Sequence, residues 1–200
     1  ENILPAGDAF HDVAAKIPQM TRMIDEGLIG DKGTKGGFYR NRNETKRETL
    51  DLDHFSYRDY NNDKPAVAIH AEAAGDFTIL LSADDRYGEY AWKILSDTLC
   101  YAAELVPDVN ESLVAVDDAM KLGYNWIQGP FEMMDSIGID SFIARLESNG
   151  RQVPTFIKTA SSKTFYRIDD GNLQYLRADG SYQILERAAD VTRFTEKRRT

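Results

Sequence analysis

The sequence predicts a mainly α-helical protein that ends in a small β-meander. Apolar residues recur at intervals of three and four through most of residues 83–155, which is the period of an amphipathic helix. Beyond Pro154 this period gives way to short alternating runs that are rich in aromatic and β-branched residues. Two Asp-Gly pairs, at residues 170–171 and 179–180, separate these runs and predict the turns between antiparallel strands.

The composition is that of a soluble globular protein. Its 200 residues are 42% hydrophobic, which is enough to build a core. No apolar run approaches the ~20 residues of a membrane span, and no signal peptide opens the chain, so a cytoplasmic location without membrane contact is expected. The net charge of −9 argues against nucleic acid as a partner. The single cysteine, Cys100, lies on the apolar face of a predicted helix and is expected to serve packing.

The first third of the chain combines one short helix with a glycine-rich loop. The helix begins at Pro18 and stops at Gly27. The loop leads into an extended segment at residues 38–40. Residues 41–65 are charged and rich in asparagine, so they are predicted to form a mostly exposed connection. The glycines of the loop are Gly30, Gly33, Gly36 and Gly37.

A long helix over about residues 83–106 is expected to be central to the fold. Ser82 or Asp84 is the predicted N-cap, and Pro107 ends the helix. Its predicted apolar stripe consists of Tyr87, Ala91, Ile94, Leu95, Thr98, Leu99, Ala102 and Leu105.

Three shorter helices are predicted to follow. Ser112 caps the first of them, and Gly123 is expected to supply the left-handed position at its end. Its predicted buried residues are Val116, Ala119 and Met120. Pro130 starts the second helix and Gly138 ends it. The third helix ends at residues 149–150, and its apolar face carries Ile139, Phe142, Ile143 and Leu146.

The glycine cluster at residues 30–37 resembles a phosphate-binding loop only superficially. Its spacing matches neither G-x-G-x-x-G nor G-x-x-x-x-G-K-[ST], and it follows a helix, whereas such a loop would follow a buried strand. A structural turn is therefore the favoured interpretation, and a phosphate-loop enzyme is the remote alternative. The chain also lacks a dinucleotide-binding fingerprint elsewhere.

The titratable residues are interpreted as structural. The histidines are scattered through polar segments and are expected to be exposed: His11, His54 and His70. Paired carboxylates can do acid–base chemistry, and four carboxylates occur close together in the sequence: Asp117, Asp118, Glu132 and Asp135. Glu132 lies in the first turn of a predicted helix, whose N-terminus favours negative charge. Asp117 and Asp118 are expected on the polar side of their helix.

Residues 117–138 carry the most specific signal, an acidic helix ending in AMKLG, a GPFE turn and an amphipathic helix. This stretch resembles the core of the C-terminal helical domain of bacterial 3-hydroxyacyl-CoA dehydrogenases. Residues 30–40 are similar to the GDK…GGFY turn that closes the first of two tandem C-terminal domains in long members of that family. Residues 85–104 resemble the helix that opens the second domain. Residues 177–182 resemble a linker that leads into an enoyl-CoA hydratase module.

The resemblance implies a helical bundle of the 6-phosphogluconate dehydrogenase C-terminal type. Residues 1–45 would be the end of the first domain and residues 46–82 a connecting segment. Residues 83–155 would be the second domain and residues 156–200 a β-rich linker or tail. The structural residues that the two motifs share with the family are Gly36, Gly37, Phe38, Tyr39, Gly129, Pro130 and Phe131.

The GPFE turn is expected to be architectural. Gly129 would take a backbone position that other residues resist, Pro130 would fix the helix start, and Phe131 would anchor the turn in the core. Both Phe131 and Trp126 are predicted to be more than half buried. Tyr124 and Trp126 are candidates to line an acyl pocket, with plain packing as the alternative.

The resemblance also implies a function. The parent enzyme would oxidise an L-3-hydroxyacyl-CoA of fatty-acid β-oxidation to the 3-ketoacyl-CoA with NAD⁺. The family's catalytic histidine and glutamate belong to an NAD-binding domain that this chain lacks, so no catalytic, cofactor-binding or metal residue is expected here. The isolated chain should be inactive. Its partners would be the rest of the parent enzyme, the acyl-CoA substrate and a second subunit of a homodimer.

Two interpretations of the whole chain remain. The first is a C-terminal region of a multidomain dehydrogenase that contributes to the substrate cleft and to dimerisation. The start at Glu1, without an initiator methionine, favours this excised region. The alternative is a free-standing, non-catalytic helical interaction module.

Overall fold

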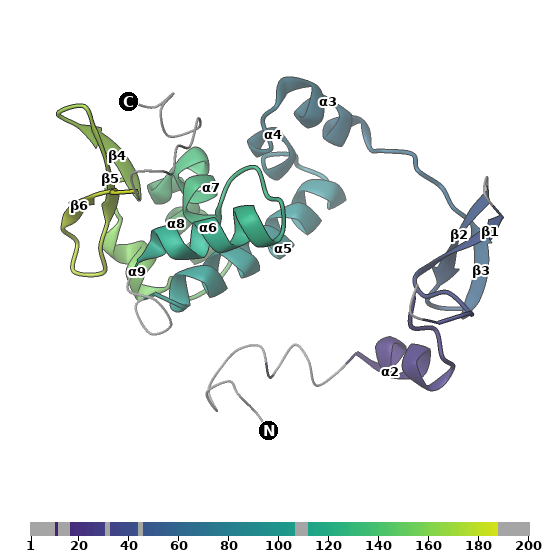
Figure 1. Cartoon of the computed structure of the whole chain (residues 1–200). Helices are drawn as coiled ribbons and strands as arrows, with labels where there is room; N and C mark the ends of the chain where they lie inside the picture. The colour runs from purple at the N-terminus through teal and green to yellow at the C-terminus, as the bar shows by residue number, and fades with distance from the viewer. Residues whose placement is uncertain (1–10, 12–16, 31–32, 44–45, 107–111, 188–200) are drawn as a thin grey trace. The chain divides into compact units, whose positions relative to one another are not determined.

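The computed structural model divides the chain into two compact units (Figure 1). Unit 1 extends to Lys64, and unit 2 begins at Pro65. The structure describes residues 11, 17–30, 33–43, 46–106 and 112–187. Within these residues helices predominate and the strands form two small antiparallel sheets, so the predicted mainly α fold class is confirmed. None of the described helices has the length and apolar character needed to cross a membrane.

Unit 1 combines one helix with a three-stranded sheet. Helix α2 (Pro18–Asp25) has its proline in the first turn, and Gly27 beyond its end has a φ of +76°, as expected for the residue that stops a helix. The sheet has the order β1-β2-β3. Its strands are β1 (Tyr39–Asn43), β2 (Lys46–Asp51) and β3 (Ser56–Asp59).

This sheet corrects one prediction. Residues 46–65 are mostly exposed, as expected, but they are not a simple connection, because they contain β2 and β3. On β2, Glu48 and Leu50 share one face and are each 5% exposed. Glu48 is buried because its carboxylate accepts the Nε–H of its cross-strand neighbour Arg40 at 2.6 Å. The buried position 48 of β2 thus carries a charged residue. An apolar residue there would have shown the alternation of apolar and polar residues that is typical of a strand.

Unit 2 contains seven helices within its described residues, and the longest of them is α5. This helix contacts α4, α7 and α9. The first two helices of the unit lie in the segment that was predicted to be a connection. The helices are α3 (Ala66–Ala74), α4 (Thr78–Leu81), α5 (Arg86–Glu104), α6 (Leu113–Gly123), α7 (Pro130–Ile137), α8 (Ile139–Ser148) and α9 (Thr155–Thr159).

Helix α5 confirms the predicted long helix but not its N-cap, and its predicted apolar stripe is confirmed only in part, since Leu99 and Ala102 are buried. The N-cap is Asp85, whose carboxylate accepts the N–H groups of Tyr87 and Gly88 at 2.8 and 2.9 Å. Ile94 of the predicted stripe is 51% exposed. The buried face of α5 contains several small residues, which allow neighbouring segments to approach closely. At Gly88, for example, a Cβ would overlap the carbonyl group of Ala83. This face consists of Gly88, Trp92, Ser96, Leu99, Cys100, Ala102 and Ala103.

The predicted β-meander is confirmed and belongs to the core of unit 2. Its strands are β4 (Tyr166–Asp169), β5 (Asn172–Leu176) and β6 (Tyr182–Ile184), in the order β4-β5-β6. The first turn has positive φ values at Asp170 and Gly171, as a tight hairpin requires. Phe165, Tyr166, Leu173 and Leu176 join the same buried cluster as Leu99, Phe131 and Phe142. The sheet is therefore an integral layer of unit 2.

Candidate functional site

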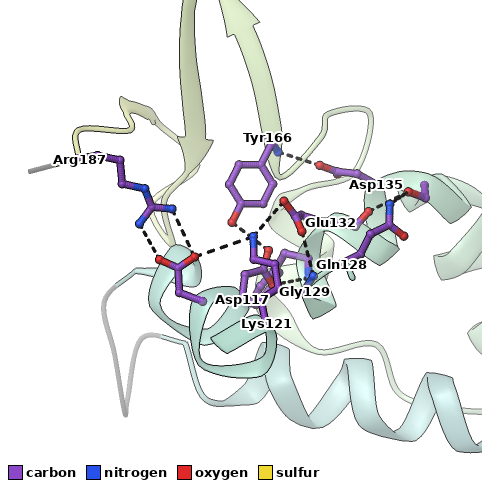
Figure 2. A network of polar contacts seen from close by, with 11 residues as sticks. Asp117, Lys121, Gln128, Gly129, Glu132, Asp135, Tyr166 and Arg187 are labelled. Carbon is purple, nitrogen blue, oxygen red and sulfur yellow. Dashed lines mark hydrogen bonds and ion pairs between the residues drawn. The ribbon is translucent and has the colours of Figure 1, made fainter. Parts of the chain in front are cut away.

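The four carboxylates that lie close together in the sequence also meet in space, around the turn between α6 and α7. Figure 2 labels Asp117, Glu132 and Asp135 together with Lys121 of α6, Tyr166 of β4 and Arg187, which follows the second sheet. We call this group the α6–α7 network. It surrounds the GPFE turn, residues 129–132.

Asp117 is the centre of the network. Its side chain is fully buried, so the prediction that it lies on the polar side of its helix was wrong. One carboxylate oxygen accepts the N–H of Phe131 at 2.9 Å, and the other accepts the hydroxyl of Tyr166 at 2.9 Å. The N–H groups in the first turn of a helix have no partner within the helix. Asp117, on α6, therefore supplies a hydrogen-bond acceptor for an N–H group in the first turn of α7.

Gly129 allows this carboxylate to approach. Its φ of −77° and ψ of 168° are accessible to any residue, so the predicted conformational reason for a glycine was wrong. A Cβ at this position would instead overlap the side chain of Asp117. The Gly129 N–H donates to the Glu132 carboxylate at 2.9 Å, which is the glutamate half of a capping box, since a glycine has no side chain to supply the other half. This confirms the predicted place of Glu132 at the helix start.

A second layer of charges surrounds these contacts. The Lys121 ammonium lies 3.1 Å from Glu132 and 3.9 Å from Asp118. Arg187 donates to both oxygens of Asp118, at 2.5 and 3.3 Å. Such bidentate pairs fix the orientation of both groups. Arg187 thus ties the segment after β6 to helix α6.

Asp135 holds the start of the second sheet. Its two carboxylate oxygens accept the N–H groups of Phe165 and Tyr166 at 2.7 and 2.8 Å. Together with Asp117, it attaches the first strand of the sheet to helices α6 and α7. The four carboxylates therefore connect structural elements to one another. Among the described residues, no group of His, Cys, Asp and Glu side chains could hold a metal ion.

Burial changes the protonation of this network. It raises the pKa of Asp117 to about 7, and the neighbouring Glu132 carboxylate acts in the same direction. The hydrogen bonds from Phe131 and Tyr166 and the charge of Lys121 oppose the increase in this pKa. Burial, and next the Asp117 carboxylate, raise the pKa of Tyr166 well above its ordinary value.

Asp117→Asn is expected to remove a pH dependence of stability. Between the unfolded pKa of 3.8 and the folded pKa of about 7, the folded chain binds more protons, so its free energy of unfolding falls as the pH rises. The shift corresponds to up to about 4 kcal/mol, at ~1.4 kcal/mol per pKa unit. Asparagine keeps an acceptor for the Phe131 N–H without a charge. Urea denaturation of the parent chain and of Asp117→Asn at pH 4.5, 5.5, 6.5 and 7.5 measures the free energy of unfolding at each pH. If this free energy changed with pH equally in both proteins, the raised pKa of Asp117 would be contradicted.

The last turn of α6 and the loop after it expose apolar side chains. Phe131 is fully buried and Trp126 is partly buried, so both predictions of burial are confirmed. Leu122 and Tyr124 are each 73% exposed, and Ile127 is 93% exposed. We call the segment of residues 122–127 the apolar loop. Both candidate acyl-pocket residues, Tyr124 and Trp126, belong to it.

The end of α6 differs from the prediction. Gly123 is the last residue of the helix and has no positive φ, and Asn125 takes the left-handed position instead, with a φ of +57°. The buried residues of α6 are Leu113, Val114 and Asp117, whereas Ala119 is exposed. The predicted stripe was wrong because a buried carboxylate lies on the inward face.

The glycine motif of unit 1 forms a tight turn. Gly36 has a φ of +88°, and a Cβ at Gly37 would lie 2.8 Å from the backbone nitrogen of Gly30. The Tyr57 hydroxyl donates to the Gly37 carbonyl at 2.6 Å. Phe38 and Tyr39, the other motif residues in this unit, are 45% and 46% exposed. These contacts show that the cluster forms a closely packed turn, and its purely structural role stays a prediction.

The remaining candidate residues lie elsewhere. Cys100 is buried in the core of unit 2, and this burial raises the pKa of its thiol to about 11. His54 and His70 are exposed, and His11 is partly buried. His54 contacts the Asp51 carboxylate through Nδ1 at 3.1 Å within a turn, a local pairing that its sequence spacing did not suggest.

Comparisons with known proteins agree with the sequence motifs. The family model described as "3-hydroxyacyl-CoA dehydrogenase, C-terminal domain" matches residues 90–197, which include the second sheet. The chain is 35% identical over 182 residues to a probable 3-hydroxyacyl-CoA dehydrogenase of Bacillus subtilis (strain 168), with 87% of this chain and 23% of the relative covered.

A second relative is a putative fatty acid oxidation complex trifunctional enzyme of Rickettsia felis, which is 30% identical over 169 residues. That match covers 83% of this chain and 22% of the relative. No solved structure matches the chain significantly. The chain spans less than a quarter of the length of these curated relatives. It belongs to the 3-hydroxyacyl-CoA dehydrogenase family and contains that family's C-terminal domain.

Proposed function

We propose that this chain is the C-terminal region of an NAD-dependent 3-hydroxyacyl-CoA dehydrogenase of fatty-acid β-oxidation. The complete enzyme would oxidise an L-3-hydroxyacyl-CoA to the 3-ketoacyl-CoA and pass the hydride to NAD⁺ held by another domain. This region would form one side of the substrate cleft and contribute to the contact between two subunits. It would not catalyse the reaction alone. Its family membership and the names of its two relatives support the proposal.

The observation that carries the proposal is the apolar loop on its rigid support. Leu122, Tyr124 and Ile127 expose large apolar side chains within a segment of six residues. The GPFE turn that follows is fixed by hydrogen bonds from Gly129 and Phe131. An apolar surface on a fixed turn can bind a flexible acyl chain without a further cost for ordering the protein. We therefore infer that the apolar loop binds the acyl chain of the substrate.

Polar substitutions in the apolar loop of the complete dehydrogenase test this assignment. Tyr124→Ser and Ile127→Ser should each raise the KM for a long-chain 3-hydroxyacyl-CoA by roughly tenfold, the scale of losing apolar contacts in a pocket. The KM for NAD⁺ and for a four-carbon substrate should change little, because neither fills the acyl site.

Tyr90→Ser is a matched control. Tyr90 lies on α5 and is 69% exposed, close to the exposure of Tyr124. If the two loop variants leave every KM unchanged and instead dissociate the dimer, the loop is an assembly surface and the acyl assignment is wrong. That outcome would also favour the alternative of a helical interaction module.

A further inference from the structure

Unit 1 contains a pocket of about 690 Å³ that the proposed function does not use. This volume is within the range of sites for small ligands. The pocket is lined by the glycine turn and by the start of the first sheet. The polar and cationic side chains among its described lining residues are Thr34, Lys35, Arg40, Asn41 and Tyr57. Both of the charged ones are positive.

Arg40 is held in a fixed orientation beside this pocket. Its Nε donates to Glu48 at 2.6 Å, and Glu48 is only 5% exposed. Its guanidinium carbon lies 3.8 Å from the centre of the Tyr57 ring. These contacts use the Nε side and one flat face of the guanidinium. The two terminal nitrogens remain to donate to a ligand, in the planar geometry that suits phosphate oxygens.

Lys35 is oriented by the end of helix α2. Its ammonium donates to the carbonyl of Glu26 at 2.9 Å. An ammonium group has three N–H bonds, so this contact leaves two for a ligand. Because Glu48 balances the charge of Arg40, Lys35 supplies the remaining positive charge among the described lining residues.

The backbone of the glycine turn adds further donors. The N–H groups of Gly30, Gly33 and Gly37 bond to carbonyls of the turn itself and of Tyr39. In contrast, the N–H groups of Thr34 and Lys35 find no acceptor among the residues that the structure describes. Successive N–H groups in a turn with a left-handed residue, here Gly36, form concave sites that bind anions.

We propose that this pocket binds the phosphate group of a nucleotide-sized ligand. Lys35 would act as a point charge, Arg40 as a two-pronged donor, and the turn N–H groups would complete the contacts to a tetrahedral oxyanion. The sequence motif of known phosphate loops is absent because these donors come from a turn after a helix and from strand β1. The proposal concerns unit 1 only and is independent of the acyl assignment in unit 2.

Calorimetric titration of the 200-residue chain with ADP, coenzyme A, inorganic phosphate and adenosine tests the proposal. ADP and coenzyme A should bind, inorganic phosphate should compete with them, and adenosine should not bind. Lys35→Gln should weaken ADP binding at least tenfold, whereas Lys35→Arg should retain it. Lys158→Gln changes an exposed lysine of helix α9 in the other unit and should leave ADP affinity unchanged.

A double variant keeps the test of Arg40 independent of folding. Arg40→Gln alone would leave Glu48 buried without its cation, so Arg40→Gln with Glu48→Gln removes both charges together. This variant should also weaken ADP binding at least tenfold. Tighter binding of ADP or coenzyme A than of phosphate would assign a nucleotide as the ligand, and equal binding would assign phosphate itself. Equal binding of adenosine and ADP, or an unchanged affinity in Lys35→Gln, would overturn the proposal.

Discussion

Replacing Phe131 by alanine is expected to lower the free energy of unfolding of unit 2 by about 3–5 kcal/mol, the range for deleting an aromatic ring from a packed core. The side chain is fully buried. Its ring packs edge-on against Phe156 and Phe165, with centroid distances of 5.6 and 4.8 Å. These two residues belong to α9 and to the start of the second sheet, so the loss would loosen three elements at once.

Urea denaturation followed by tryptophan fluorescence measures this effect, because Trp92 and Trp126 both lie in unit 2 and Trp92 is buried in its core. Tyr90→Ala is the control, since its side chain is 69% exposed and its loss should change stability by less than about 0.5 kcal/mol. If Phe131→Ala unfolded at the same urea concentration as the parent chain, the GPFE turn would not be an architectural anchor.

The sequence predicts helix ends well where the signals are local. Pro130 and Gly138 bound α7, and Ser112 caps α6 by accepting the N–H of Val114, as expected. A cap or a stop depends on one residue and its immediate backbone, so no distant part of the chain is needed to place it. The Asp-Gly turns of the second sheet are predictable for the same reason.

The faces of the helices are harder to predict because they depend on distant partners. Asp117 interrupts the apolar pattern of α6, and its buried position makes sense only with Tyr166, which lies 49 residues further along the chain. The Arg40 and Glu48 pair hides the strand β2 in a similar way. In both cases a polar group is buried because a partner on another element satisfies it. Hydrophobic periodicity alone cannot detect such a pair.

The motif residues of the candidate site illustrate the same limit. A glycine before a proline at a helix start is a recognisable signal, and the sequence identifies Gly129 as important. The physical reason, however, is the approach of a side chain from a different helix and not an unusual backbone angle. The chain likewise leaves α6 through a left-handed Asn125, two residues after the helix ends at Gly123, whereas the sequence analysis placed the left-handed residue at Gly123.

Gly129→Ala should therefore destabilise unit 2 through a steric overlap alone. The added methyl group would collide with the side chain of Asp117, which is fixed by hydrogen bonds to Phe131 and Tyr166. Relief requires either a shift of α7 or the loss of one of these bonds to a buried carboxylate. Overpacking and a lost buried hydrogen bond together are expected to cost roughly 2–4 kcal/mol.

Gly123→Ala provides the matched control, because it makes the same change six residues earlier in the chain. Gly123 lies in the last turn of α6, is exposed and has nothing within 4 Å of an added Cβ. Alanine favours a helix over glycine, so this variant should be neutral or gain up to about 1 kcal/mol. Opposite signs for the two variants, measured by urea denaturation, would show that Gly129 is required for contact with Asp117. Equal stability of both variants would contradict the close packing of α6 on the GPFE turn, and with it the rigid support that the acyl assignment requires.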